Sequence, residues 1–264
     1  MEHICLLIRH GFLSAASYGA VPNSSRTICR VYPKVLICVS LRFRLPNHYV
    51  RIKADNRLEA DGTLRGTFTL TAEGQSDSNI RRIFTTGFQS EWKSTMERQL
   101  LAISPKARLL SVDYGKNPKD YQAAPIKITF RYEIPDYALK GEGEMFFRPM
   151  VMNNLYNQVR SYMWIDTSVE NRKYGFKDAC SRLVELDETV QLPAGYKLVS
   201  AVKDETMQGV GADFEGSLVQ KGNKVLLHNR LALKKRVYEA SDWESFRNAV
   251  NAHKAYGEYL VIKK

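Results

Sequence analysis

Apolar and polar residues alternate most regularly in the last third of the chain, from Val190 to Lys264. Between Phe214 and Val237, two alternating runs flank Gly222-Asn223, a pair that readily adopts the positive φ angles of a tight turn. The pattern predicts a β-hairpin. Because successive strand side chains point to opposite sides, one face should be buried and the other exposed to water. The apolar positions are Val225, Leu227, Leu231 and Leu233, and the polar positions include His228 and Arg230.

A helix is predicted after this hairpin, from residue 242 to residue 256. Ser241-Asp242-Trp243-Glu244 has the sequence of a capping box, in which the serine and the glutamate bond to each other's backbone N–H groups. An apolar stripe follows at helical spacing, and Gly257 stands where a left-handed cap would end the helix. The stripe consists of Trp243, Phe246 and Val250. Residues 258–264 should close the chain as a short strand.

A second region of regular pattern begins at Tyr49. Residues 49–54 and 64–72 alternate on either side of Asp61-Gly62, which predicts a second hairpin. Residues 79–102 have helical spacing and predict one helix, capped by Ser76, Asp77 or Ser78. Its apolar positions, which we interpret as core, are Ile80, Ile83, Phe84, Phe88, Trp92, Met96, Leu100 and Ile103. Further strands are predicted at 109–114, 125–134 and 143–147, followed by a long connection from 153 to 182.

These elements predict an α+β, mainly β fold with two β-rich, sandwich-like units, each with one amphipathic helix packed on its sheet. The chain is long enough for two domains that each bury a core. We place a middle domain at 49–178, with its helix at 79–102. A C-terminal domain follows at 179–264, with its helix at 242–256.

Residues 1–48 differ from the rest in composition. They contain six Lys or Arg and one acidic residue, and they include Cys5, Cys29 and Cys38. Two interpretations remain open: an atypical, poorly ordered extension, or translated sequence that precedes the native coding frame. The second is favoured because the composition changes where strand patterning begins. The first residues lack the uninterrupted apolar core of a signal peptide, and no run approaches the roughly 18 apolar residues of a membrane span.

The net charge of +11 raises the question of a polyanionic partner. Residues 1–48 carry nearly half of the excess, and acidic residues are interspersed with basic ones in the remainder. The densest basic run, Lys234-Lys235-Arg236, lies on a predicted strand, where it is more typical of a solvated or edge-protecting face. We therefore expect no nucleic acid partner, and polyanion binding stays as an alternative.

Candidate chemistry is sparse. The four cysteines do not have metal-ligand spacing, so we predict no metal site and no cofactor. A cysteine nucleophile would have to be Cys180, but it precedes a predicted strand rather than a helix. His228 is expected on the polar hairpin face, and His253 at the surface or half-buried. The carboxylate pairs Asp187-Glu188, Asp204-Glu205 and Glu142 with Glu144 are expected in solvent. The sequence therefore predicts no catalytic, cofactor-binding or metal-binding residues.

Two blocks of the chain resemble a known family. ENRKYGFKDACSRLVELDETVQLPAGYKLVS (Glu170–Ser200), followed by NRLALKKRVYEASDWESFRNAV (Asn229–Val250) and a terminal YLVIKK, resembles the C-terminal region of bacterial transglutaminase-like proteins of unknown function, especially those of Bacteroidetes. RIKADNRLEADGTLRGTFTLTAEGQSDSNIRRIF (Arg51–Phe84) looks like the segment after the transglutaminase core in the same proteins. The resemblance covers about residues 49–264, and its motifs are structural rather than catalytic.

The resemblance implies a C-terminal portion of an exported, multidomain protein, without the papain-like core and its Cys-His-Asp triad. We therefore expect a non-catalytic scaffold or interaction portion whose partner is another protein or the missing core. The alternatives are a cysteine-dependent hydrolase or transglutaminase remnant that uses Cys180, and a polyanion-binding module. The localisation of this chain does not follow from its sequence.

Overall fold

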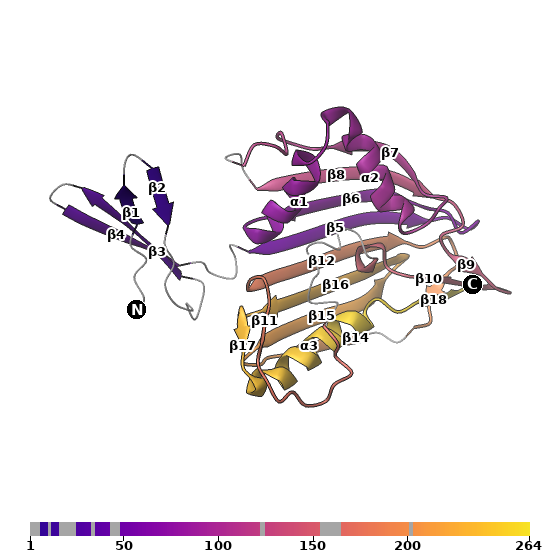
Figure 1. Ribbon diagram of the computed structural model, residues 1–264. Helices are drawn as coiled ribbons and strands as arrows, with labels where there is room; N and C mark the ends of the chain where they lie inside the picture. Colours follow the sequence, from indigo (N-terminus) through magenta and orange to yellow (C-terminus); the bar gives the residue numbers. More distant parts are fainter. Residues whose placement is uncertain are drawn as a thin grey trace.

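Eight strands form one large sheet in the order β14-β15-β16-β12-β5-β6-β8-β7 (Figure 1). The computed structural model describes residues 48–121, 125–153, 165–200 and 203–264, together with the backbone of strands at 6–9, 12–15, 25–32 and 35–42. The eight strands are β5 (Tyr49–Leu58), β6 (Leu64–Ala72), β7 (Arg108–Asp113), β8 (Ile126–Ile134), β12 (Arg182–Gln191), β14 (Lys203–Met207), β15 (Ala212–Lys221) and β16 (Lys224–Leu233). Neighbouring strands are antiparallel except β12 and β5, which are parallel.

Both predicted hairpins are confirmed. β5 pairs with β6 from Val50 opposite Ala72 to Leu58 opposite Leu64, and Gly62 between them has a φ of 88°. β15 pairs with β16 across Gly222, whose φ is 60°. These are conformations that glycine adopts without steric cost, so each turn fixes the register of its hairpin.

The large sheet buries one face and exposes the other. Val50, Ile52 and Leu70 lie on the buried face, and the register continues this face through Val184 of β12 and Leu231 of β16. The three α-helices pack on this side (Figure 1). The opposite face carries polar and charged residues, as the alternation predicted.

The single helix predicted for 79–102 is wrong. The chain forms α1 (Gln75–Thr85), a 3-10 turn η2 (Gln89–Glu91) and α2 (Trp92–Leu101). After the break the chain turns back, which brings the ring centroids of Trp92 and Phe84 to 5.3 Å from each other. The Trp92 indole N–H donates a hydrogen bond to the Phe84 carbonyl at 3.3 Å. The turn leaves Phe88, predicted as core, 76% exposed. Tertiary packing of the aromatic rings therefore overrode the helical period.

The C-terminal helix α3 (Trp243–Ala255) confirms the predicted span to within a residue at each end. Its predicted caps are wrong. The N–H that is capped belongs to Glu239, which donates to Asp242 Oδ2 at 2.9 Å across the preceding 3-10 turn η6 (Ala240–Asp242). Gly257 does not have a positive φ, so it does not form the predicted left-handed cap. Trp243 and Phe246 are buried as predicted.

Smaller sheets complete the molecule. β13 (Lys197–Leu198), β18 (Leu260–Lys263), β10 (Glu144–Phe147) and β9 (Leu139–Lys140) form a four-stranded sheet, and β11 (Phe176–Lys177) pairs with β17 (Val237–Tyr238). The described part of the predicted connection packs along α3. Trp243 Nε1 donates to the Val169 carbonyl at 2.9 Å, and Arg247 Nε donates to the Thr167 carbonyl at 2.9 Å.

Four short strands precede the large sheet, in a region for which the sequence pattern predicted no element. β1 (Leu6–Arg9) pairs with β2 (Phe12–Ala15), and β3 (Ser25–Tyr32) pairs with β4 (Val35–Arg42). Neither pair joins the large sheet (Figure 1). The status of residues 1–48 as a poorly ordered or non-native segment stays a prediction.

The α+β, mainly β class is confirmed. The large sheet combines strands from both predicted units, because β5 at residue 49 and β12 at residue 182 lie side by side. The prediction that the chain consists of two domains, divided near residue 178, stays a prediction. Within the part of the chain that the structure describes, no helix is long and apolar enough to cross a membrane.

Candidate functional site

Cys180 lies two residues before β12 begins, and the residue is buried, with 7% of its surface exposed. The Arg182 guanidinium donates a hydrogen bond to the thiol sulfur at 3.7 Å, and Arg182 itself lies 3.8 Å from the Asp178 carboxylate. Burial raises the pKa of the Cys180 thiol, and this effect outweighs the opposing effect of Arg182. A catalytic cysteine requires a depressed pKa and access to substrate. This environment instead keeps the thiol protonated.

His228 lies on the polar face of the sheet, as predicted. Its Nδ1 is 2.6 Å from Oδ1 of Asp187, which stands directly opposite on β12. The hydrogen bond raises the pKa of His228 and lowers that of Asp187. Both side chains are more than a third exposed, so the pair contributes little to stability.

Glu188, expected in solvent, is fully buried on the opposite side of the same strand. Its Oε1 accepts a hydrogen bond from Asn56 Nδ2 at 2.6 Å, and its Oε2 accepts one from the Val151 N–H at 3.1 Å. Tyr132 extends the cluster by donating to Asn56 Oδ1 at 2.5 Å. Burial raises the pKa of Glu188 to about 7. The carboxyl thus ties β12 to β5 and to the 3-10 turn η3 (Met150–Met152).

The other described histidines are engaged away from Cys180. His253, expected at the surface or half-buried, is fully buried on α3, with Nδ1 2.5 Å from Asn229 Oδ1. Asn229 Nδ2 donates in turn to the His253 carbonyl at 3.3 Å. His48 Nδ1 accepts from the Gln75 N–H at 3.2 Å. In the part of the chain that the structure describes, the Cys180 thiol is therefore paired with a guanidinium and not with an imidazole.

The remaining carboxylate candidates occupy strand and turn positions. Asp204 and Glu205 follow one another on the edge strand β14, so their side chains point to opposite faces. Glu142 lies exposed in a bend, and Glu144 forms an ion pair with Lys263 at 3.0 Å. The described residues contain no group of three or more His, Cys, Asp or Glu side chains that could hold a metal ion.

The basic run Lys234-Lys235-Arg236 forms ion pairs within the molecule. Lys234 Nζ lies 2.6 Å from Asp213, and Lys235 Nζ lies 2.6 Å from Asp242. The two lysines are therefore neutralised locally, which argues against a phosphate-binding role for this run.

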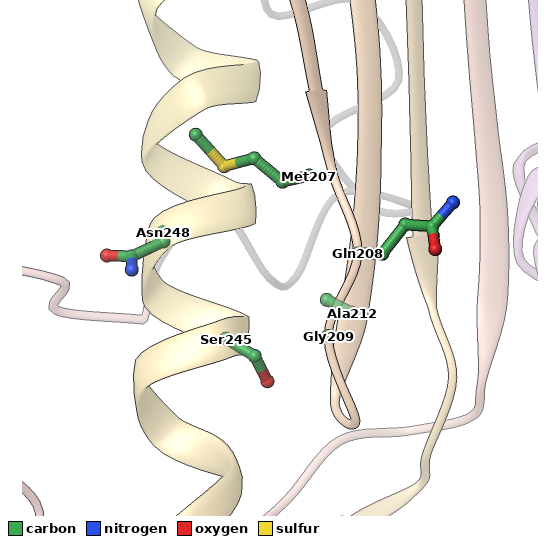
Figure 2. Close-up of a pocket in the computed structure, with 6 residues that line it drawn as sticks. All are labelled: Met207, Gln208, Gly209, Ala212, Ser245 and Asn248. Atoms are coloured by element: carbon green, nitrogen blue, oxygen red, sulfur yellow. The ribbon is translucent and has the colours of Figure 1, made fainter.

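A pocket of about 370 Å³ lies between α3 and the connection from β14 to β15 (Figure 2). Its lining residues are Met207, Gln208, Gly209, Ala212, Ser245 and Asn248. Ser245 Oγ accepts from the Gly211 N–H at 3.0 Å, and a Cβ at Gly209 would come within 2.4 Å of the Ser245 Cβ. Gln208 points away from the helix in Figure 2. The close approach of loop and helix is thus structural, and no titratable side chain lines the pocket.

Comparison with known proteins gives a match to one family over part of the chain. Residues 143–261 match the family described as "Domain of Unknown Function with solved-structure structure (DUF3858)". No curated protein matches the chain. Among solved structures, the chain is similar to the "crystal structure of a putative protease" from Parabacteroides distasonis, with 12% identity and a TM-score of 0.40. The match covers 47% of this chain and spans about a quarter (24%) of the other. This similarity is too low to establish a shared fold.

Proposed function

We propose that the chain is a non-catalytic scaffold or interaction portion of an exported, transglutaminase-like protein whose catalytic core lies elsewhere. The observation that carries the proposal is the environment of Cys180, the cysteine for which the structure describes a side chain. Its thiol is buried, its pKa is raised, and its hydrogen-bond partner is a guanidinium rather than an imidazole.

The family match supports the same proposal. It covers residues 143–261, which include β10, β12, β15, β16 and α3. The blocks that resemble the C-terminal region of transglutaminase-like proteins include β12, part of β16 and most of α3. In this proposal the partner is the catalytic core of the longer protein, or another protein.

The competing proposal is a cysteine-dependent hydrolase or transglutaminase remnant that uses Cys180. It requires a thiolate at neutral pH and a general base beside it. The two proposals therefore predict opposite reactivities for one thiol.

Alkylation of the native full chain by iodoacetamide distinguishes the two proposals. Mass spectrometry measures how fast the peptide that contains Cys180 is modified. We expect Cys180 in the folded protein to react more slowly at pH 6 to 8 than in the same chain unfolded in urea. Cys180→Ser identifies the peptide and corrects for the other cysteines. If native Cys180 reacted faster at pH 6 than the unfolded chain, its pKa would be depressed and the non-catalytic proposal would fail.

A further inference from the structure

One row on the polar face of the large sheet, which crosses seven of its eight strands, concentrates positive charge. In the strand registers, each residue of this row lies directly opposite the next one on the neighbouring strand. In order, the residues are Lys221, Lys224, Gln191, Arg57, Arg65, Glu133 and Arg108. We call these seven residues the basic row. It crosses β15, β16, β12, β5, β6, β8 and β7, and five of its seven members are cationic.

Like charges directly opposite one another destabilise a sheet pair, and the basic row contains two such pairs. Arg57 faces Arg65 on neighbouring strands, and Lys221 faces Lys224 across the β15–β16 turn. This arrangement costs stability unless carboxylates or a bound anion compensate for it.

Carboxylates compensate only part of the row. Glu59 lies 3.1 Å from Arg57 and 3.9 Å from Arg65, and Glu133 lies 2.7 Å from Arg65 and 3.3 Å from Arg108. Two carboxylates thus form ion pairs with three arginines. Among the described residues, Lys221 and Lys224 take part in no ion pair.

A hollow of about 250 Å³ opens beside the row, between the paired arginines Arg57 and Arg65 and Lys224, which is unpaired among the described residues. It is lined by Asp55, Asn56, Arg57, Arg65, Thr189, Gln191 and Lys224. Three cationic side chains from β16, β5 and β6 therefore border one space. The neutral donors Thr189 and Gln191 lie between them on β12. Asp55 belongs to the next row, opposite Thr189, so the positive charge is concentrated at the side where Lys224, Arg57 and Arg65 lie.

We propose that this hollow binds a tetrahedral oxyanion, a phosphate or sulfate group, through Arg57, Arg65 and Lys224. Guanidinium groups present paired N–H donors that match the oxygen atoms of such groups, and a lysine adds a point charge. The anion would add to the compensation that Glu59 and Glu133 already give to Arg57 and Arg65. The run Lys234-Lys235-Arg236 has no part in this site, because it does not border the hollow.

Calorimetric titration of the full chain with inorganic phosphate, at low ionic strength, tests the site. We expect saturable binding that Arg57→Gln and Lys224→Gln each weaken about tenfold, the effect typical of one charge-assisted hydrogen bond. The matched control is Lys127→Gln, which removes one exposed positive charge from the same sheet face, on β8, outside the row. It should change the affinity less than twofold.

Thermal unfolding checks that the variants are folded and tests the repulsion separately. Without phosphate, Arg57→Gln should unfold at or above the temperature of the unaltered protein, and phosphate should raise this temperature for the unaltered protein more than for the variant.

A heparin fragment replaces phosphate in a second titration. If the heparin fragment binds more tightly than phosphate, and Arg57→Gln and Lys224→Gln both abolish this binding, the natural oxyanion belongs to a polymer. If heparin binds no more tightly than phosphate, the natural oxyanion is a small ligand. The proposal is overturned if neither probe binds saturably, or if Lys127→Gln weakens binding as much as Arg57→Gln does.

Discussion

Replacing Glu188 with glutamine tests whether one buried carboxyl makes the stability of this fold depend on pH. The pKa of Glu188 rises from 4.5 to about 7 on folding, mainly because burial disfavours the charged form. A raised carboxyl pKa means that its stabilising contribution is fully present below pH 4.5. That contribution is lost as the pH rises through about 7, because the folded state must then bury a charge.

The size of the loss follows from the difference of about 2.5 pH units between the two pKa values. Each unit corresponds to about 1.4 kcal/mol, so the unaltered protein should lose roughly 3 kcal/mol between pH 4.5 and pH 8. Glutamine is neutral throughout, so the variant should lack this term. The His228–Asp187 pair also titrates, because Asp187 raises the pKa of His228 above 6.5. It is present in both proteins and cancels when their stabilities are subtracted.

Urea denaturation at several pH values between 4.5 and 8 measures the free energy of unfolding of both proteins. Glu188→Gln retains one carbonyl oxygen for two donors, Asn56 Nδ2 and the Val151 N–H, so it should be the less stable protein at pH 4.5, by about 1–3 kcal/mol. The gap should close or reverse towards pH 8. Glu188→Ala should show the same loss of pH dependence, with lower stability at every pH because it leaves a cavity. A difference between the unaltered protein and Glu188→Gln that stays constant across this range would refute the reasoning.

Three further predictions concern stability. Trp243→Ala or Phe246→Ala should each cost about 3–5 kcal/mol in urea denaturation, because both rings are buried against the sheet, and losses under about 1 kcal/mol would contradict this. Gly66→Ala should cost about 3 kcal/mol by the same assay, because its Cβ would meet Asn56 Oδ1 at 1.8 Å and the Asp55 carbonyl at 2.6 Å; a neutral effect would show that the strand shifts freely. A chain beginning at Tyr49 should unfold with the same midpoint and m-value as the full chain, since β1 to β4 do not join the large sheet, and a lower midpoint would show that the preceding residues stabilise the fold.

Local sequence rules determined the two hairpins and the C-terminal helix. Gly62 and Gly222 adopt positive φ angles that other residues reach only at a cost, so the turns and the registers beside them follow from a few adjacent residues. Alternation along each strand likewise determined which face is buried. The span of α3 followed from the spacing of Trp243, Phe246 and Val250, although its cap did not.

Only the tertiary structure decided the parallel pairing of β12 with β5, the break between α1 and α2, and the burial of Glu188. Each depends on residues far apart in the chain: Glu188 meets Asn56 because the parallel register brings their strands together. The hollow bordered by Arg57, Arg65 and Lys224 arises in the same way, from three strands that no local pattern connects. Periodicity and turn chemistry act over a few neighbouring residues, whereas strand order and side-chain burial are fixed by contacts that form only when the whole sheet assembles.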